Sequence, residues 1–354
     1  MRPSLQRQRN RIAHQKTYLG GALIVIAAIG ATDVTAASTS ASHAPAVEQV
    51  GKYIREDVLD TRTALREMLL AAGPDSSVGA YPPSVRQQML SFYEQREFGP
   101  AWTGRPAERG RASEILDVLA RAGDQGLRSE DYGSPAQWSG EPAAGKEAAE
   151  YELVLTEAVL RYARDVSVGR IRPYQVYEDA QLPDPHFDPV GVLARMLDSP
   201  SMSTALADLP PPHAEYQRLV QALARYHDVE RKGGWPILPN GVFNLESHDS
   251  RVALLIRRLA LEDPKLAAIS APSSNELREA VKRFQTRNSL VSDGRVTVAT
   301  LAALNVPVSA RIKQIIANME RWRWLPRTFE NTYISVNVPD QRCKKLLAIA
   351  ILHG

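Results

Sequence analysis

The sequence predicts a mainly α-helical protein with a helical scaffold-like domain, a small three-helix module and a first β-strand near its C-terminal end. Aromatic residues make up only 6% of the 354 residues, while alanine and leucine are abundant, which favours helix. Apolar residues recur at i, i+3, i+4 and i+7 in several segments, and Pro- and Gly-rich stretches separate those segments. The composition, 44% hydrophobic and 23% charged, is that of a globular protein with room for two or three domains.

The first 36 residues have the composition of an export signal. A basic stretch precedes an apolar run over residues 19–31, and the small residues Val34, Thr35 and Ala36 follow as a cleavage pattern. The run is short for a membrane span, which needs about 20 apolar residues. We expect residues 1–36 to be a signal peptide that directs the protein to the periplasm. The alternative is an uncleaved inner-membrane anchor formed by residues 19–31, and only then is the membrane a partner.

The formal charge of +3 comes from this leader, because residues 37–354 hold 38 Lys and Arg against 39 Asp and Glu. Such a balance gives no reason to expect a nucleic-acid partner.

Residues 37–80 predict a small polar tether and a helix, which ends before Gly73 and Pro74. Residues 81–229 predict a helical domain that begins with a helix over 84–98. A second helix has one apolar face, formed by Ala112, Ile115, Leu116 and Leu119. A longer helix stops at Gly169, and its predicted apolar face consists of Tyr151, Val154, Leu155, Ala158 and Tyr162. Because each stripe needs a partner, we expect these helices to pack as a bundle.

Residues 230–306 predict a compact module of short helices. The first helix carries the apolar stripe Val252, Leu255, Ile256 and Leu259. Ser274 or Asn275 is expected to cap a second helix that bears Leu277, Ala280, Val281 and Phe284. Asp293 and Gly294 predict a turn, and Thr297 is expected to cap the last helix, whose Leu301 and Leu304 face inward.

Residues 307–354 predict one more helix and then a strand. Ser309 is the expected cap of a helix with the stripe Ile312, Ile315, Ile316 and Met319, which ends at Pro326. Ile334, Val336 and Val338 alternate with polar residues, as in a half-buried strand. The tail after Pro339 does not continue as a hairpin in this interpretation, so the strand is expected to stand alone.

The module resembles a small peptidoglycan-binding domain. The resemblance rests on the segment Ala280 to Gln285 (AVKRFQ), on Leu290, on the Asp293-Gly294 turn and on Thr300, Leu301 and Leu304. It implies a peptidoglycan partner. Polar side chains are the candidates for contact with a wall peptide, since an arginine fork matches a carboxylate. The predicted binding residues are Arg283, Gln285 and Arg287.

The chain as a whole resembles large L,D-transpeptidases of the YcbB type. The residues that carry the resemblance are the segments 92–102 (FYEQREFGPAW), 124–132 (DQGLRSEDY), 155–173 (LTEAVLRYARDVSVGRIRP) and 233–241 (GGWPILPNG). Such enzymes use a cysteine thiolate, a histidine base and backbone oxyanion donors to form 3→3 cross-links. The family's Ser-x-Gly-Cys signature is missing, because Cys343 lies in DQRCKKL. We therefore expect no catalytic residue here, and residues 307–354 to be the truncated start of the catalytic domain.

The expected function is binding of peptidoglycan by an exported protein that does not cross-link it. Two alternatives stay open: an L,D-transpeptidase whose catalytic C-terminus is missing from this sequence, and a scaffold partner of another envelope enzyme. No metal site and no cofactor is expected. Hydrolase motifs such as GxSxG and HExxH do not occur in the sequence.

Overall fold

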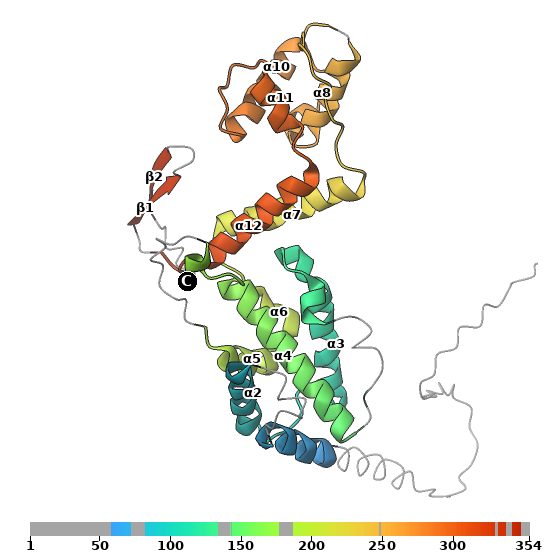
Figure 1. The fold of residues 1–354 in the computed structure, drawn as a ribbon, viewed down its shortest axis with the longest axis vertical. Coiled ribbons are helices and arrows are strands. Elements are labelled where there is room, and N and C mark those ends of the chain that lie inside the picture. The colour runs from blue at the N-terminus through green and yellow to red at the C-terminus, as the bar shows by residue number, and fades with distance from the viewer. Residues whose placement is uncertain are drawn as a thin grey trace, which may run out of the picture. The chain divides into compact units, whose positions relative to one another are not determined.

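The computed structural model describes residues 58–71, 82–133, 142, 144–176, 187–247 and 249–329, together with the backbone of 332–337 and 342–347. The predicted signal peptide and the candidate anchor 19–31 lie outside the described residues. Within the described ranges, no helix is long and apolar enough to cross a membrane. The fold is mainly helical, as the sequence predicts (Figure 1).

The helical domain begins with a helix over residues 58–70. It continues with α2 (Pro83–Gln95), α3 (Pro106–Ala120), α4 (Lys146–Val168), α5 (Pro189–Asp198) and α6 (Met202–Ala207). Short 3-10 turns are η2 (Ala122–Gln125), η3 (Ser129–Tyr132) and η5 (Pro173–Gln175). The predicted helices over 84–98 and around Ile115 are thus present, with ends that differ by a few residues.

Helix α4 lies at the centre of this domain, and α2, α3 and α5 pack against it (Figure 1). The predicted face is too narrow, because buried side chains occur around the whole helix, including Leu153, Val159 and Val166. Helix packing on several sides explains why one amphipathic stripe is an incomplete description. Gly169 ends the helix with φ of 86°, a conformation that glycine adopts without strain.

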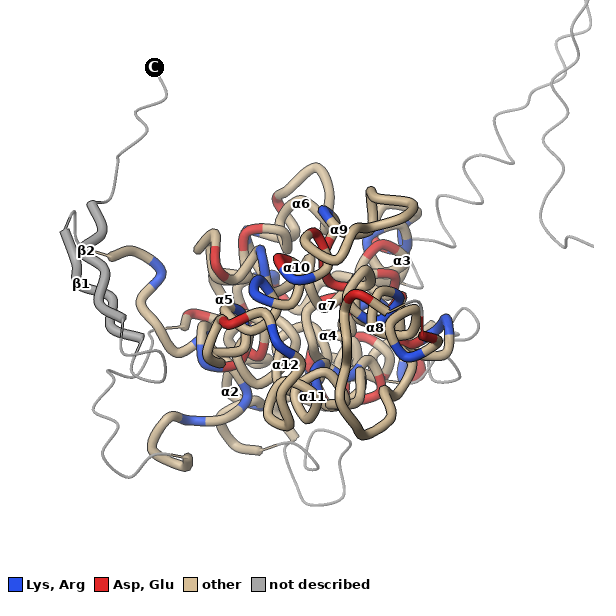
Figure 2. Tube along the Cα trace, turned by 90° about the horizontal axis from the view of Figure 1, so that it is seen from above, with Lys and Arg blue, Asp and Glu red and all other residues tan. Residues whose placement is uncertain are grey.

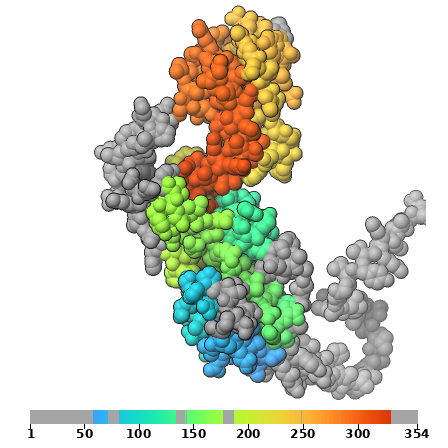
Figure 3. Space-filling model, in the orientation of Figure 1, coloured from blue at the N-terminus to red at the C-terminus, as the bar shows by residue number. Residues whose placement is uncertain are grey.

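Two antiparallel helices follow, α7 (Ala214–Arg231) and α12 (Val308–Arg323), whose chain-distant segments lie side by side (Figures 1 and 3). Tyr216, Leu223, Val308, Ile312 and Met319 form their shared core. The expected cap Ser309 is wrong: Pro307 is the N-cap, and no side chain closes this end. Pro307, with φ of −58°, starts the helix two residues too early for Ser309 to cap it.

The module comprises α8 (Ser250–Ala260), α9 (Pro264–Ala267), α10 (Ser274–Arg287) and α11 (Val298–Leu304). Its core contains the predicted Phe284, Leu301 and Leu304. The expected cap of α10 is wrong by one residue, because Ser273 caps it and forms a reciprocal capping box with Glu276. Thr297 caps α11 as predicted, and its hydroxyl accepts a hydrogen bond from the backbone of Thr300.

The C-terminal strand does not stand alone. Strand β1 (Thr332–Asn337) pairs antiparallel with β2 (Arg342–Leu347), with Thr332 opposite Leu347 and Val336 opposite Cys343. The expectation that the tail departs from a hairpin is therefore wrong. Unpaired N–H and C=O groups of a lone strand are costly, and β2 supplies a partner for those of β1.

Candidate binding site

The loop between α10 and α11 is fixed by one buried side chain, Gln285. Its Nε2 donates hydrogen bonds to Asp293 Oδ1 at 2.8 Å, to the Arg295 carbonyl at 2.9 Å and to Thr300 Oγ1 at 3.1 Å. Its Oε1 accepts from the backbone N–H of Gly294 at 2.8 Å. Gln285 is only 1% exposed, so its amide shapes the loop from inside the module. Direct contact of Gln285 with a ligand stays a prediction.

The Asp293-Gly294 turn forms as the sequence predicts. Hydrogen bonds from the backbone N–H of Arg295 and from Gln285 lower the pKa of Asp293. Gly294 has φ of 74°, and a Cβ there would meet Arg278 Cγ at 2.6 Å. The turn therefore requires glycine for both its dihedral and its space.

Arg283 bridges two helices of the module. Its Nε and Nη2 lie 2.9 Å and 2.7 Å from Asp263 Oδ2. Asp263 is buried and also caps α9, accepting from the backbone N–H of Lys265 and Leu266. The guanidinium of Arg283 is half-buried, so part of its donor set faces solvent while the rest holds Asp263 in place.

Arg287 is the exposed member of the predicted set. It lies in the last turn of α10, and no hydrogen bond or ion pair joins it to any residue that the structure describes. The exposed apolar side chains Val291 and Val298 follow in the adjacent loop and in α11. A guanidinium without a partner among the described residues is able to hold a carboxylate of a peptide.

A buried arginine that the sequence analysis did not single out joins the module to α7. Arg258 is fully buried and lies 3.8 Å from the ring centroid of Trp235. Its Nη1 pairs with Glu262 at 2.6 Å, and its Nε donates to the Leu304 carbonyl at 2.8 Å. The hydroxyl of Tyr226 in α7 donates to the other oxygen of Glu262. The burial of Arg258 could have been predicted from the sequence, since Arg258 falls three residues after Leu255 on the apolar stripe of α8.

The helical domain buries a carboxylate that was also missed, that of Glu152 near the N-terminal end of α4. Its oxygens accept from the backbone N–H groups of Ala101, Trp102 and Thr103, at 2.8, 2.8 and 2.6 Å, and from the hydroxyl of Tyr93. Burial raises the pKa of Glu152, and these hydrogen bonds oppose the rise. The carboxylate ties loop 99–103 to the domain core.

Residues of both charges are spread along the described chain. Figure 2 shows lysine and arginine interspersed with aspartate and glutamate along the helices, without a stripe of one sign. Among the described residues, no cluster of three His, Cys, Asp or Glu side chains has the arrangement of a metal site.

Fold and site together define a modular helical protein: a helical domain, a joining pair of helices and a small module with a shaped polar loop. Residues 87–223 match the family model described as "Scaffold domain", and residues 250–304 match that described as "Putative peptidoglycan binding domain". A comparison with curated proteins found no match. The chain thus carries a scaffold domain together with a peptidoglycan-binding domain, and this pair of domains suggests a cell-wall-associated protein related to L,D-transpeptidases.

Proposed function

We propose that this protein binds peptidoglycan through the module formed by α8 to α11, while the scaffold domain carries that module. The observation that carries the proposal is the match of residues 250–304 to a peptidoglycan-binding domain. The compact core and capped helices of the module support it, because a small domain must be rigid to present a polar surface at low entropic cost.

Within the module we assign the ligand contact to Arg287, with the solvent-facing side of Arg283 next to it. Arg287 has no competing ion pair in the described residues, so its full donor set is available to a wall-peptide carboxylate. In this proposal Gln285 acts indirectly, by holding residues 293–295 in the shape that the ligand meets.

We further propose that the protein acts in the periplasm, exported by residues 1–36. Cross-linking needs a thiolate beside an oriented base, and the sequence around Cys343 contains no such signature. We therefore assign wall binding, and no cross-linking step, to these residues. The role of partner to another envelope enzyme is a separate proposal.

The test is sedimentation of the purified chain with insoluble peptidoglycan. The unaltered protein should sediment saturably, and Arg287→Ala should weaken binding about 3- to 10-fold, the loss of one charge-assisted contact. Gln285→Ala should weaken binding and also destabilise the module, whereas Arg287→Ala should leave the melting temperature unchanged. Arg225→Ala, an exposed arginine on α7, is the matched control and should bind normally.

Failure of the unaltered chain to sediment would refute wall binding. Capture of another envelope enzyme in a separate pull-down with the purified chain would then favour the partner role. A covalent carbapenem adduct on Cys343 would refute the view that these residues perform no acyl chemistry.

A further inference from the structure

Helix α12 follows the module directly, and its first turn contacts the module through one arginine. Arg311 lies in this turn, outside residues 250–304, which match the peptidoglycan-binding family model. Its Nη2 donates hydrogen bonds to Asn288 Oδ1 at 2.8 Å and to the Ala303 carbonyl at 3.0 Å. Its Nη1 donates to Gln314 Oε1 at 3.1 Å. All three acceptors are neutral, so the whole charge of Arg311 acts on the module.

The two acceptors in the module lie at the C-terminal ends of two helices. Asn288 is the C-cap of α10, and Ala303 lies in the last turn of α11. The carbonyl groups at the C-terminal end of a helix give it a partial negative charge, so a guanidinium there is stabilising. Arg311 therefore joins the ends of α10 and α11 from a third helix.

Asn288 transmits this contact to the end of α10. Its Nδ2 donates to the Phe284 carbonyl at 2.9 Å, and its backbone N–H donates to the carbonyls of Phe284 and Gln285. Ser289 follows with φ of 55°. A residue other than glycine adopts this conformation at a cost, so neighbouring contacts must hold it. The exposed Arg287 directly precedes this segment, and the place of its backbone therefore depends on the contact between Asn288 and α12.

Arg311 can fix α10 only if α12 is itself held, and the last turn of α12 is anchored in the scaffold domain. Glu320 Oε1 accepts hydrogen bonds from the backbone N–H groups of residues 170–171, just after α4. Arg323 donates to the hydroxyl of Tyr216 at 2.9 Å and pairs with Glu320 at 2.9 Å. The side chains of Glu320 and Arg323 are buried, which makes this anchor part of the folded core.

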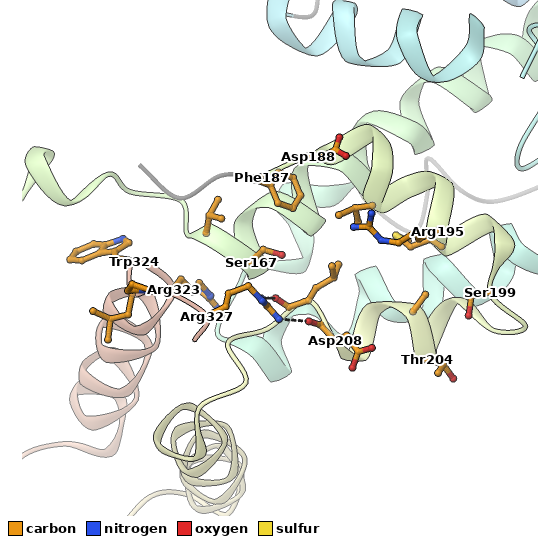
Figure 4. Close-up of a pocket in the computed structure, with 17 residues that line it drawn as sticks. Ser167, Phe187, Asp188, Arg195, Ser199, Thr204, Asp208, Arg323, Trp324 and Arg327 are labelled. Carbon is orange, nitrogen blue, oxygen red and sulfur yellow. Dashed lines mark hydrogen bonds between the residues drawn. The ribbon is translucent and has the colours of Figure 1, made fainter. Parts of the chain in front are cut away.

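The segment after α12 adds a second anchor, on the loop after α6. Arg327 donates to the backbone carbonyls of residues 208–210, and Figure 4 shows its guanidinium reaching toward the segment that carries Asp208. His213 Nε2 lies 3.0 Å from the Pro326 carbonyl. Because contacts on both sides of residue 324 hold the end of α12, Arg311 acts on the module from a fixed helix.

We propose that Arg311 is a positioning residue of the wall-binding site: from α12 it fixes the capped end of α10 and so holds Arg287 where it meets the ligand. The inference rests on the proposed function, because it takes Arg287 as the ligand contact. It extends the binding unit beyond residues 250–304. It also gives the scaffold domain a part in binding, since that domain anchors the helix that carries Arg311.

The test is a double-mutant cycle of Arg311 and Arg287, measured by sedimentation of the full chain with insoluble peptidoglycan. Arg311→Gln should weaken binding about 3-fold, because Asn288 loses its donor from α12. In the Arg287→Ala background the same change should alter binding by less than about 1.5-fold, since the positioned group is already absent. Lys313→Gln, which removes an exposed cation two residues further along α12, is the matched control and should bind normally.

Circular dichroism sets a temperature at which every variant is folded, so a loss of stability alone does not change the measured affinity. Arg311→Lys keeps the cation but not the fork, and it should weaken binding less than Arg311→Gln does. If Arg311→Gln does not fold, Arg311→Lys carries the same cycle.

Normal binding by the Arg311 variants, with binding by Arg287→Ala weakened, would overturn the positioning role and leave wall binding intact. Equal losses from Arg311→Gln and Lys313→Gln would assign the effect to net charge. Additive losses in the double variant would assign it to a contact independent of Arg287, and either of these results would also overturn the proposal. Unchanged binding by Arg287→Ala would refute the assigned ligand contact and the positioning role together.

Discussion

The scaffold domain and the module each contain a buried charged side chain, and different interactions stabilise it in each region. In the scaffold domain, Glu152 is surrounded by neutral donors, namely three backbone N–H groups and two hydroxyls. In the module, Arg258 is balanced by the carboxylate of Glu262 and by the face of Trp235. The difference shows that one region uses charge to fix a loop, whereas the other uses an ion pair to fix the junction with α7.

The largest expected effect lies in the module. Arg258→Ala leaves Glu262 partly buried without its cation and opens space beneath Trp235, so we expect unfolding free energy to fall by about 3–5 kcal/mol. The neighbouring Arg257→Ala, at an exposed position, should change it by no more than about 0.5 kcal/mol. Urea denaturation of the full chain, with hydrogen exchange to locate the loss, measures both. A small effect of Arg258→Ala would mean that the ion pair does not stabilise the junction.

The next effect tests the scaffold domain. Glu152→Gln replaces one acceptor oxygen by an NH2 group that faces backbone N–H donors, and we expect a loss of about 2–3 kcal/mol. Glu150→Gln on the same helix, half-exposed, is the control and should cost less than about 1 kcal/mol. Hydrogen exchange should show the loosening in loop 99–103. Equal protection of that loop in both variants would contradict the role assigned to Glu152.

The smallest expected effect is a difference between the two regions in how their stability depends on pH. Burial raises the pKa of Glu152 and Asp165, so the folded scaffold binds protons more readily, and its stability contribution from these groups falls as pH rises through their raised pKa values. Hydrogen bonds lower the pKa of Asp293 and Glu276, so their contribution is present above the ordinary value of about 4 and is lost below it.

On acidification from pH 7 toward pH 3, we therefore expect the loop of the module to lose protection before the core of α4 does. Hydrogen exchange on the full chain, corrected for the intrinsic rate at each pH, measures the order. Asp293→Asn should remove most of the dependence in the loop at 293–295. Loss of protection in α4 first would reverse the comparison.

Local patterns in the sequence were enough for several helices and for much of the module, whereas α5, α6 and α7 were not predicted. The stripes of α3, α8, α10 and α12, the cap at Thr297 and the turn at Gly294 all follow from periodicity and turn chemistry within about ten residues. The cap at Ser273 was within reach of the same reasoning, because Glu276 completes an S-x-x-E pattern.

Only part of the candidate site could be predicted from the sequence. Arg283, Gln285 and Arg287 were chosen as polar residues on one helix, but their different burial could not be read from that helix alone. Gln285 is buried because the loop at 293–295 folds over it, and Arg283 is engaged because α9 brings Asp263 beside it. The pairing of β2 with β1 likewise depended on which segment meets the first strand.

The sequence by itself determined where helices such as α3, α4, α8 and α10 lie, which apolar residues form the stripes of α3, α8 and α10, and where the module turns. Only the tertiary structure decided which charged residues are buried and what satisfies them. The physical reason is distance along the chain: Glu152 meets loop 99–103 about 50 residues away, and Arg258 meets the Leu304 carbonyl 46 residues away. Such partners become neighbours only when the helices pack, so the apolar periodicity of a single segment cannot predict them.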